Sequence, residues 1–253
     1  MGRYSAEVPG FDLSSTFRNL CRSSPWKWTT LRFEYLERPG TGASLVRAWL
    51  RRPGALRLET VDGQLLHSTT GINDSRDDMY VSATRRSWLL PAHLVTPVYD
   101  DAGLVRRRPE AAYGEPSFGN GRLAAALDPV ELAGNAPVPI EFPDTNRVFA
   151  ESMCEVDHEG RPALEAIVTP SRTYVPSDPI HPLVHVGRTL LRIDIGTGVC
   201  VASQSLDGDS SGTGHWLKIL GVDEYMLDDL FLAESMNLTD VRRHIPWDIG
   251  PAA

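Results

Sequence analysis

The sequence predicts a mainly β protein of the α+β class, in which antiparallel strands surround a cupped apolar interior. Residues 45–71 carry the first signal, because charged and apolar side chains alternate there with the period of a β-strand. Pro53-Gly54 and Asp62-Gly63 interrupt that alternation and are strong turn signals. Similar alternating segments return late in the chain. Their apolar faces predict a cupped interior.

A short amphipathic helix is expected first, over residues 12–21. Phe17, Leu20 and Cys21 recur there at helical spacing, and the Ser-Ser-Pro run 23–25 is predicted to end the helix. Strands follow wherever the apolar period falls to two. In chain order they are expected at 26–36, 45–51, 55–61, 64–70, 147–156, 163–169, 188–195, 199–206 and 215–222.

The middle of the chain, at about 84–146, is predicted to be an irregular helical insertion into a single domain of residues 1–253. Residues 122–133 are typical of one or two short helices broken near Pro129. The remaining elements are less regular: a possible strand at 79–83, a long loop at 100–121, a short helix at 224–233 and a polar tail from about 234. Long insertions of this kind often act as lids or binding loops.

Composition excludes several functional classes. A net charge of −8 disfavours nucleic acid and anionic lipid as partners, and no apolar run is long enough for stable membrane insertion. Three cysteines are too few for a disulfide framework and suit a reducing compartment. The first residues lack the apolar core of a secretion signal, so we expect a cytoplasmic protein.

Several strands carry an alternating charge pair on their polar face, where period-two spacing puts both members on one side of the sheet. We interpret these pairs as an ion-paired outer surface rather than as a catalytic acid and base. The pairs are Arg32/Glu34, Arg57/Glu59 and Arg192/Asp194.

No pattern in the sequence identifies a catalytic centre, a metal site or a cofactor site. His181 and His185 have the spacing of two metal ligands, but the prolines around them exclude a regular helix and no further ligand completes the set. The Gly-rich segments lack a phosphate-binding fingerprint. Cys154 and Cys200 fall within apolar strand patterns, so buried, inert thiols are expected.

The segment 49–67, WLRRPGALRLETVDGQLLH, resembles the LolA/LolB-like lipoprotein carriers, a family with related lipoprotein-binding proteins in actinobacteria. Trp49, Arg52 and Pro53 match its strand-ending motif, and the segment 190–208 is similar to its Ile-Asp-x-x-Thr-Gly hairpin. The resemblance implies an incomplete β-barrel, in which a curved antiparallel sheet is closed by an N-terminal helix and by short helices that form a lid. The barrel would surround an apolar cavity for acyl chains or other hydrophobic molecules, without catalytic residues. The resemblance also implies that Arg52 helps to hold a helical lid.

We therefore expect a non-catalytic carrier or sensor of a lipid, an acyl chain or another hydrophobic small molecule. The residues expected to contact the ligand are Phe33, Tyr35, Val46, Leu50, Leu56, Leu58, Trp88 and Phe149. Two alternatives remain open. One is an enzyme of specialised metabolism that uses the same cavity, with polar groups drawn from His67, His93, Tyr99, Tyr113, Asp144, His181 and His185. The other is a regulatory module that binds a protein partner.

Overall fold

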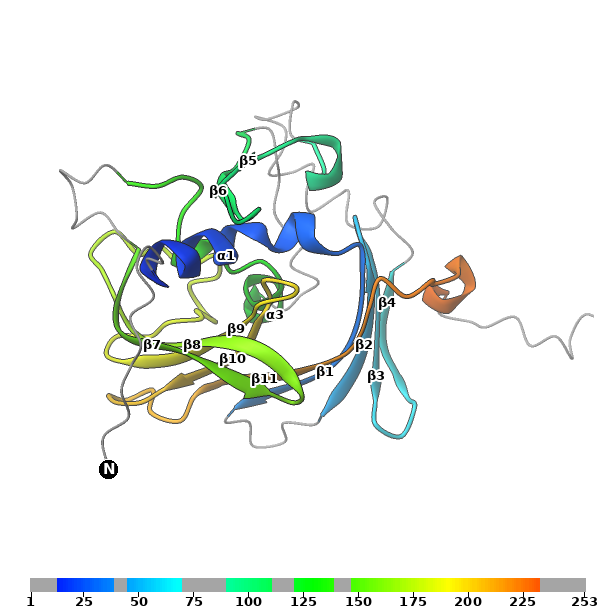
Figure 1. Ribbon diagram of the computed structural model, residues 1–253. Coiled ribbons are helices and arrows are strands. Elements are labelled where there is room, and N and C mark those ends of the chain that lie inside the picture. Colours follow the sequence, from blue (N-terminus) through cyan, green and yellow to red (C-terminus); the bar gives the residue numbers. More distant parts are fainter. Residues whose placement is uncertain (1–12, 39–44, 70–89, 111–120, 139–146, 233–253) are drawn as a thin grey trace, which may run out of the picture.

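The computed structural model describes residues 13–38, 45–69, 90–110, 121–138 and 147–232, and its centre is a nine-stranded, strongly curved antiparallel sheet (Figure 1). The strand order is β4-β3-β2-β1-β11-β10-β9-β8-β7, and β5 pairs with β6 in a separate hairpin. The predicted fold class is thereby confirmed. The elements are α1 (Leu13–Lys27), β1 (Thr30–Arg38), β2 (Val46–Arg51), β3 (Ala55–Thr60), β4 (Leu65–Thr69), η1 (Ala92–Leu94), β5 (Val98–Tyr99), β6 (Val105–Arg107), α3 (Gly121–Leu127), η2 (Pro129–Leu132), β7 (Val148–His158), β8 (Arg161–Pro170), β9 (Thr189–Asp194), β10 (Cys200–Ser205), β11 (Gly214–Val222) and η4 (Asp228–Phe231).

The strands β1 to β4 form an up-and-down meander that follows the predicted alternation. Ala48 and Leu50 of β2 point to the concave side and are buried, whereas Arg47 and Trp49 point to the convex side. Arg47 lies opposite Glu59 on β3, so charged side chains face one another across the outer surface. The expected strand at 26–36 begins only at Thr30, because the preceding residues belong to α1.

The outer charged face is confirmed, although most of the ion pairs join different strands or segments. Arg57 and Glu59 pair along β3, and Arg192 of β9 pairs with Glu165 of β8 at 2.8 Å. The remaining residues of the predicted pattern pair as Arg32–Glu224, Arg47–Glu34 and Arg161–Asp194. Asp194 departs from the prediction, because its side chain is almost fully buried at the end of β9. The other pairs are partly solvated, so each is expected to contribute only about 0–1 kcal/mol.

A second meander, β7 to β11, joins the first through β1 and β11. Leu31 pairs with Val222 and Arg38 pairs with Gly214, which places the first long strand beside the last one. The two halves thus form one continuous curved sheet. Its edges within the described part of the chain are β4 and β7.

Helix α1 crosses the concave side of this sheet and is longer than predicted (Figure 1). The Ser-Ser-Pro run does not end it, because Pro25 lies in the last turn and removes only one backbone donor from the helix. Tertiary contacts hold that turn: Trp26 Nε1 donates to Ala92 O, and Ser24 Oγ donates to Leu127 O.

Short helices fill the space between α1 and the sheet. The predicted break at Pro129 is confirmed, since α3 ends at Leu127 and η2 begins at Pro129. Leu123 and Leu127 pack with Phe33 and other residues of the first meander in one buried cluster. Ala125, Ala126 and Leu132 pack with α1 and β8 to β10 in a second cluster, so side chains of the insertion occupy the cup.

Three other expectations need correction. The loop expected at 100–121 contains β6, and within the described residues 224–232 the helical part is Asp228–Phe231. Cys154 is exposed rather than buried, because it lies on the edge strand β7, where most side chains face solvent. The possible strand at 79–83 and the polar tail lie outside the described residues.

Candidate functional site

The residues predicted to contact a ligand fall into three groups. Four of them are buried in the cluster between the first meander and α3: Phe33, Tyr35, Leu50 and Leu56. Val46 and Leu58 are partly buried and pack against that cluster. Phe149 is 43% exposed on the edge strand and belongs to neither core cluster, and Trp88 lies outside the described residues.

The concave face is therefore covered by the protein's own side chains. Leu123 and Leu127 of α3 press on the first meander, and Phe17, Leu20 and Cys21 of α1 press on the second. A ligand can reach this apolar surface only if these helices move. The contacts that hold α1 in place therefore control access to this apolar face.

Arg52 ties the C-terminal end of α1 to the turn between β2 and β3. Its Nη1 atom donates to Ser24 O at 2.9 Å and to Trp28 O at 2.8 Å. Its Cζ atom stands 3.3 Å from the centroid of the Trp28 ring, a cation–π contact. These acceptors are carbonyl groups at the end of a helix, where the partial negative charge of the helix dipole favours a cation. A single side chain therefore links sheet and helix.

Arg22 ties the middle of α1 to the segment that follows η2. Its guanidinium donates to Gly134 O at 2.7 Å, to Ala133 O at 2.8 Å and to Asn19 Oδ1 at 2.7 Å. Burial lowers the pKa of Arg22 to about 10, which still leaves it charged at neutral pH. Sequence patterns did not indicate this contact, because Arg22 lies just beyond the helix predicted over residues 12–21 and its acceptors are far away in the chain.

A second buried arginine strengthens the same junction. Arg108, just after β6, forms a two-pronged ion pair with Asp128 and donates through Nε to Arg22 O at 2.9 Å. Both side chains of the ion pair are almost fully buried. The helix is therefore attached on one side to η2 and on the other to the β2–β3 turn.

The backbone of α1 also comes unusually close to the turn between β9 and β10. Gly198 has a φ of +71°, and a Cβ atom there would lie 2.9 Å from Leu20 O and 3.0 Å from Ser24 N. Only glycine fits this position without displacing the helix. The sequence predicted the tight turn but not the contact, which joins residues far apart in the chain.

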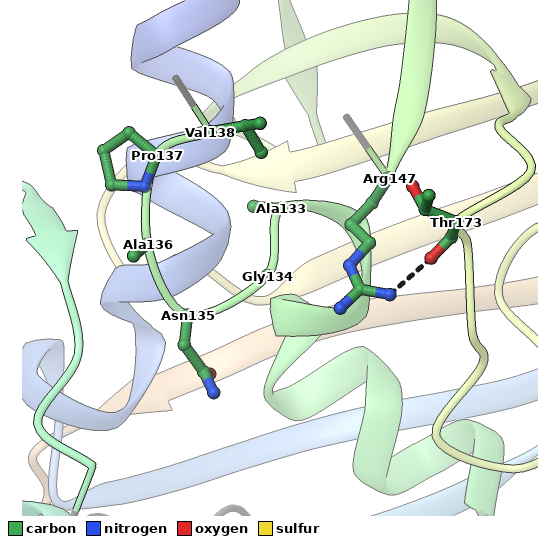
Figure 2. Close-up of a pocket in the computed structure, with 8 residues that line it drawn as sticks. All are labelled: Ala133, Gly134, Asn135, Ala136, Pro137, Val138, Arg147 and Thr173. Atoms are coloured by element: carbon green, nitrogen blue, oxygen red, sulfur yellow. Dashed lines mark hydrogen bonds between the residues drawn. The ribbon is translucent and has the colours of Figure 1, made fainter. Parts of the chain in front are cut away.

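A concave pocket in the described part of the chain has a volume of about 400 Å³ and opens to solvent (Figure 2). The segment 133–138 curves around one side, and Arg147 and Thr173 form the other. Arg147 donates to the backbone carbonyl of Thr173. No residue of β1, β2 or β3 lines this pocket, so it is separate from the apolar face described above.

A buried polar group lies beneath α3. His215 Nδ1 is 2.9 Å from Ser203 Oγ, its Nε2 is 2.7 Å from Cys200 O, and its ring stacks on Tyr35. Burial lowers the pKa of His215 to about 4, and the nearby Arg122 guanidinium lowers it further. A neutral, fully packed imidazole of this kind acts as part of the core.

The side chains named for an enzymatic reading do not converge in the cup. His67, His93 and Tyr99 lie on three separate elements: β4, η1 and β5. His181 is 3.2 Å from Asp178 Oδ2, but that pair lies on the loop after β8 and is largely solvated. His185 lies 3.4 Å from Arg122 Nη2, and burial together with that cation lowers its pKa. Tyr113 and Asp144 lie outside the described residues.

Within the described ranges, no three His, Cys, Asp or Glu side chains gather closely enough to hold a metal ion. Across the same ranges, no helix is long and apolar enough to cross a bilayer.

The segment after β11 forms a strap, residues 223–232, across the convex face of β1 to β3, and sequence patterns did not indicate it. Arg51 donates to Met226 O and Arg57 donates to Leu230 O. Phe231 is buried with Ala55 and Met226, and Trp49 packs against them. The strap thus covers apolar surface outside the cup.

Comparison with known proteins adds little to this picture. No family model matches the chain, and no curated protein matches it. Among solved structures, the crystal structure of MucB aligns with a TM-score of 0.38 and 15% identity, over 89% of this chain and 64% of that one. The chain therefore spans slightly less than two thirds of the length of the MucB chain, and at this TM-score we draw nothing further from the likeness.

Proposed function

We propose that the protein is a non-catalytic binding protein whose concave face takes up an apolar or amphipathic small molecule when α1 moves aside. The observation that carries the proposal is the attachment of α1. An apolar helix face covers an apolar sheet, and Arg52 holds its C-terminal end through two backbone carbonyls and one indole ring. The other polar contacts of α1, such as those of Arg22, join it to the segments around η2, whereas its face toward the sheet is apolar. A ligand of similar apolarity could therefore replace that face of the helix.

Ligand binding would exchange the apolar contacts between α1 and the sheet for similar contacts between the ligand and the sheet. The side chains of α1 that cover the second meander include Phe17, Leu20 and Cys21, all of them fully buried. An acyl chain placed on the same surface would restore the burial that the helix gives up, at about 25 cal/mol per Å² of apolar area. The open state with ligand bound can then come close to the closed state in free energy, and a ligand that binds the open state alone shifts the balance toward it.

The resemblance of segment 49–67 to lipoprotein carriers agrees with this reading, since it assigns Arg52 to a helical lid. The small number of cysteines suits a reducing compartment, which supports our proposal of a cytoplasmic location. The ligand class that follows is a fatty acid or a molecule of comparable size and apolarity.

The native thiols offer a direct test of helix displacement. Cys154 is exposed, whereas Cys21 of α1 and Cys200 of β10 are buried together in the second cluster. Burial raises the pKa of both buried thiols, which slows their reaction with a disulfide reagent. In the full chain without ligand, we expect one rapidly reacting thiol and two slow ones.

Titration with a long-chain fatty acid should accelerate the two slow thiols in step with saturable binding, while the rate at Cys154 stays constant. The Cys154→Ser variant provides the matched control, because it should lose only the rapid phase. Octanoate at the same concentration tests whether the effect needs a long chain rather than a detergent-like additive. Absence of saturable binding, or binding with Cys21 and Cys200 still protected, would contradict the proposal.

A further inference from the structure

The pocket around Arg147 has the composition of a site for a small organic anion. Its aliphatic lining comes from Ala133, Ala136, Pro137 and Val138, and Arg147 supplies the one charged side chain among the lining residues. Ligand sites combine apolar walls with a few placed polar groups in this way. A volume of about 400 Å³ is at the small end for such sites.

The positive charge of Arg147 is not balanced within the described part of the chain. Among the described residues, the one hydrogen-bond acceptor of its guanidinium is the backbone carbonyl of Thr173, and none of the described ion pairs includes Arg147. A guanidinium carries five N–H donors in a planar fork, so most of its donor capacity remains. A partly buried cation beside aliphatic walls favours an anion that can accept two of these donors.

Both sides of the pocket are held in place before any ligand arrives. The carbonyl of Thr173 fixes Arg147, and Arg22 holds Ala133 O and Gly134 O on the opposite side. Gly134 has a φ of +67°, and a Cβ atom at this position would lie 3.4 Å from Arg147 Nε. The backbone at Gly134 therefore lies beside the guanidinium (Figure 2), and glycine is favoured there by the positive φ rather than by a lack of space. Such preorganisation reduces the entropy lost on binding.

We infer that this pocket binds a short aliphatic carboxylate, with the carboxylate on Arg147 and the alkyl group against Ala136, Pro137 and Val138. One cation can neutralise one negative charge, which favours a carboxylate over a doubly charged phosphate. This inference does not rest on the proposed function, because the pocket opens to solvent without any movement of α1.

The test is a titration of the full chain with butyrate, followed through the backbone amide of Gly134 by NMR. A ligand of this size should show a saturable shift with a Kd on the order of 1 mM. Arg147→Gln should weaken binding about tenfold or more, because it removes the positive charge and the paired N–H donors of the guanidinium. Arg172→Gln is the matched control: Arg172 is an exposed arginine next to Thr173 that does not line the pocket, and its removal should leave the Kd unchanged.

A second variant and a neutral ligand test separately whether charge controls binding in this pocket. Ala136→Glu leaves Arg147 and its bond to Thr173 intact but adds a negative charge at the pocket wall, so it should also weaken butyrate binding. Butyramide, a neutral analogue of the same shape, should bind at least tenfold more weakly than butyrate. Equal binding by Arg147→Gln, a shift that never saturates, or inorganic phosphate binding as tightly as butyrate would overturn the assignment.

Discussion

The guanidinium of Arg52 stands over the indole of Trp28, with 3.3 Å between Cζ and the ring centroid. The same side chain donates to the carbonyl of Trp28 at 2.8 Å, so it holds both the ring and the backbone of one residue. The turn between β2 and β3 is thereby joined to the end of α1.

Replacing Arg52 with Gln should loosen the C-terminal half of α1. The change removes a cation–π contact and charged hydrogen bonds to two carbonyls, which together contribute about 1–3 kcal/mol. Hydrogen exchange at the amides of residues 20–27 should therefore accelerate about tenfold or more, while β8 and β9 stay protected. Arg38→Gln, which removes an exposed arginine at the end of β1, is the control. Equal hydrogen-exchange rates in the two variants would show that Arg52 does not hold the end of α1.

Gly198→Ala should displace α1 from the opposite side. Alanine at a positive φ costs about 1–2 kcal/mol wherever it occurs. At position 198 its Cβ atom would also collide with backbone atoms of Leu20 and Ser24. Gly63→Ala measures the first cost alone, because Gly63 has a φ of +84° and no heavy atom near its Cβ position. Urea unfolding should show a larger loss for Gly198→Ala, and equal losses would mean that the helix yields without cost.

The stability of the protein should fall as the pH drops from about 7 to about 5, through His215. Its pKa is about 4 in the folded chain and 6.5 in the absence of burial. Protonation therefore favours the unfolded chain, and the stabilisation present above pH 6.5 is lost as the pH falls toward 4. The linkage amounts to about 2 kcal/mol over this interval. Urea titrations at both pH values measure it, and His215→Gln should flatten the profile. If the free energy of unfolding of that variant changes with pH as in the original protein, another titrating group is responsible.

Phe231→Ala should release the strap from the convex face. Phe231 is almost fully buried and lies beneath the guanidinium of Arg51, with 5.0 Å between Cζ and the ring centroid. Truncation of a buried phenylalanine costs about 3–5 kcal/mol. We expect rapid proteolytic cleavage within 223–232, with the sheet left intact. Tyr225→Ala is the control, since Tyr225 is 89% exposed in the same strap and its loss should change stability by about 0.5 kcal/mol or less.

The ion pair between Arg108 and Asp128 should contribute far more than the pair between Arg32 and Glu224. Asp128→Asn leaves Arg108 buried and uncompensated, at a cost of about 3–5 kcal/mol. Glu224→Gln breaks a solvated pair and should cost about 0–1 kcal/mol. Chemical denaturation of the two variants gives the comparison. Similar losses would show that the buried arginine finds another partner.

Local patterns predicted most of the sheet. The meander β1 to β4 follows period-two alternation and two strong turn signals, so its strands and its inner and outer faces could be assigned from residues close together in the chain. The break at Pro129 is also a local effect, because proline lacks the donor that would continue α3. Helix α1 was predicted too short, because contacts from Arg52 and Ala92 support its last turn.

The candidate sites depend on contacts that no local pattern contains. Arg147 belongs to a pocket only because segment 133–138 lies beside it, and Arg22 matters because it reaches carbonyls more than a hundred positions away. The apolar faces were predicted, but not that Leu123 and Leu127 would cover them. Periodicity tells which face is apolar, whereas the identity of the element that packs on it depends on the tertiary fold.

The pairing of β1 with β11 has a consequence for how the chain reaches its native state. Each meander consists of strands that neighbour one another in sequence, so each can assemble from short-range contacts. The seam between them joins Leu31 to Val222 and must wait until β11 has left the ribosome. During synthesis β1 would therefore present an unpaired edge, and closing that seam is the step with the largest loop entropy in folding.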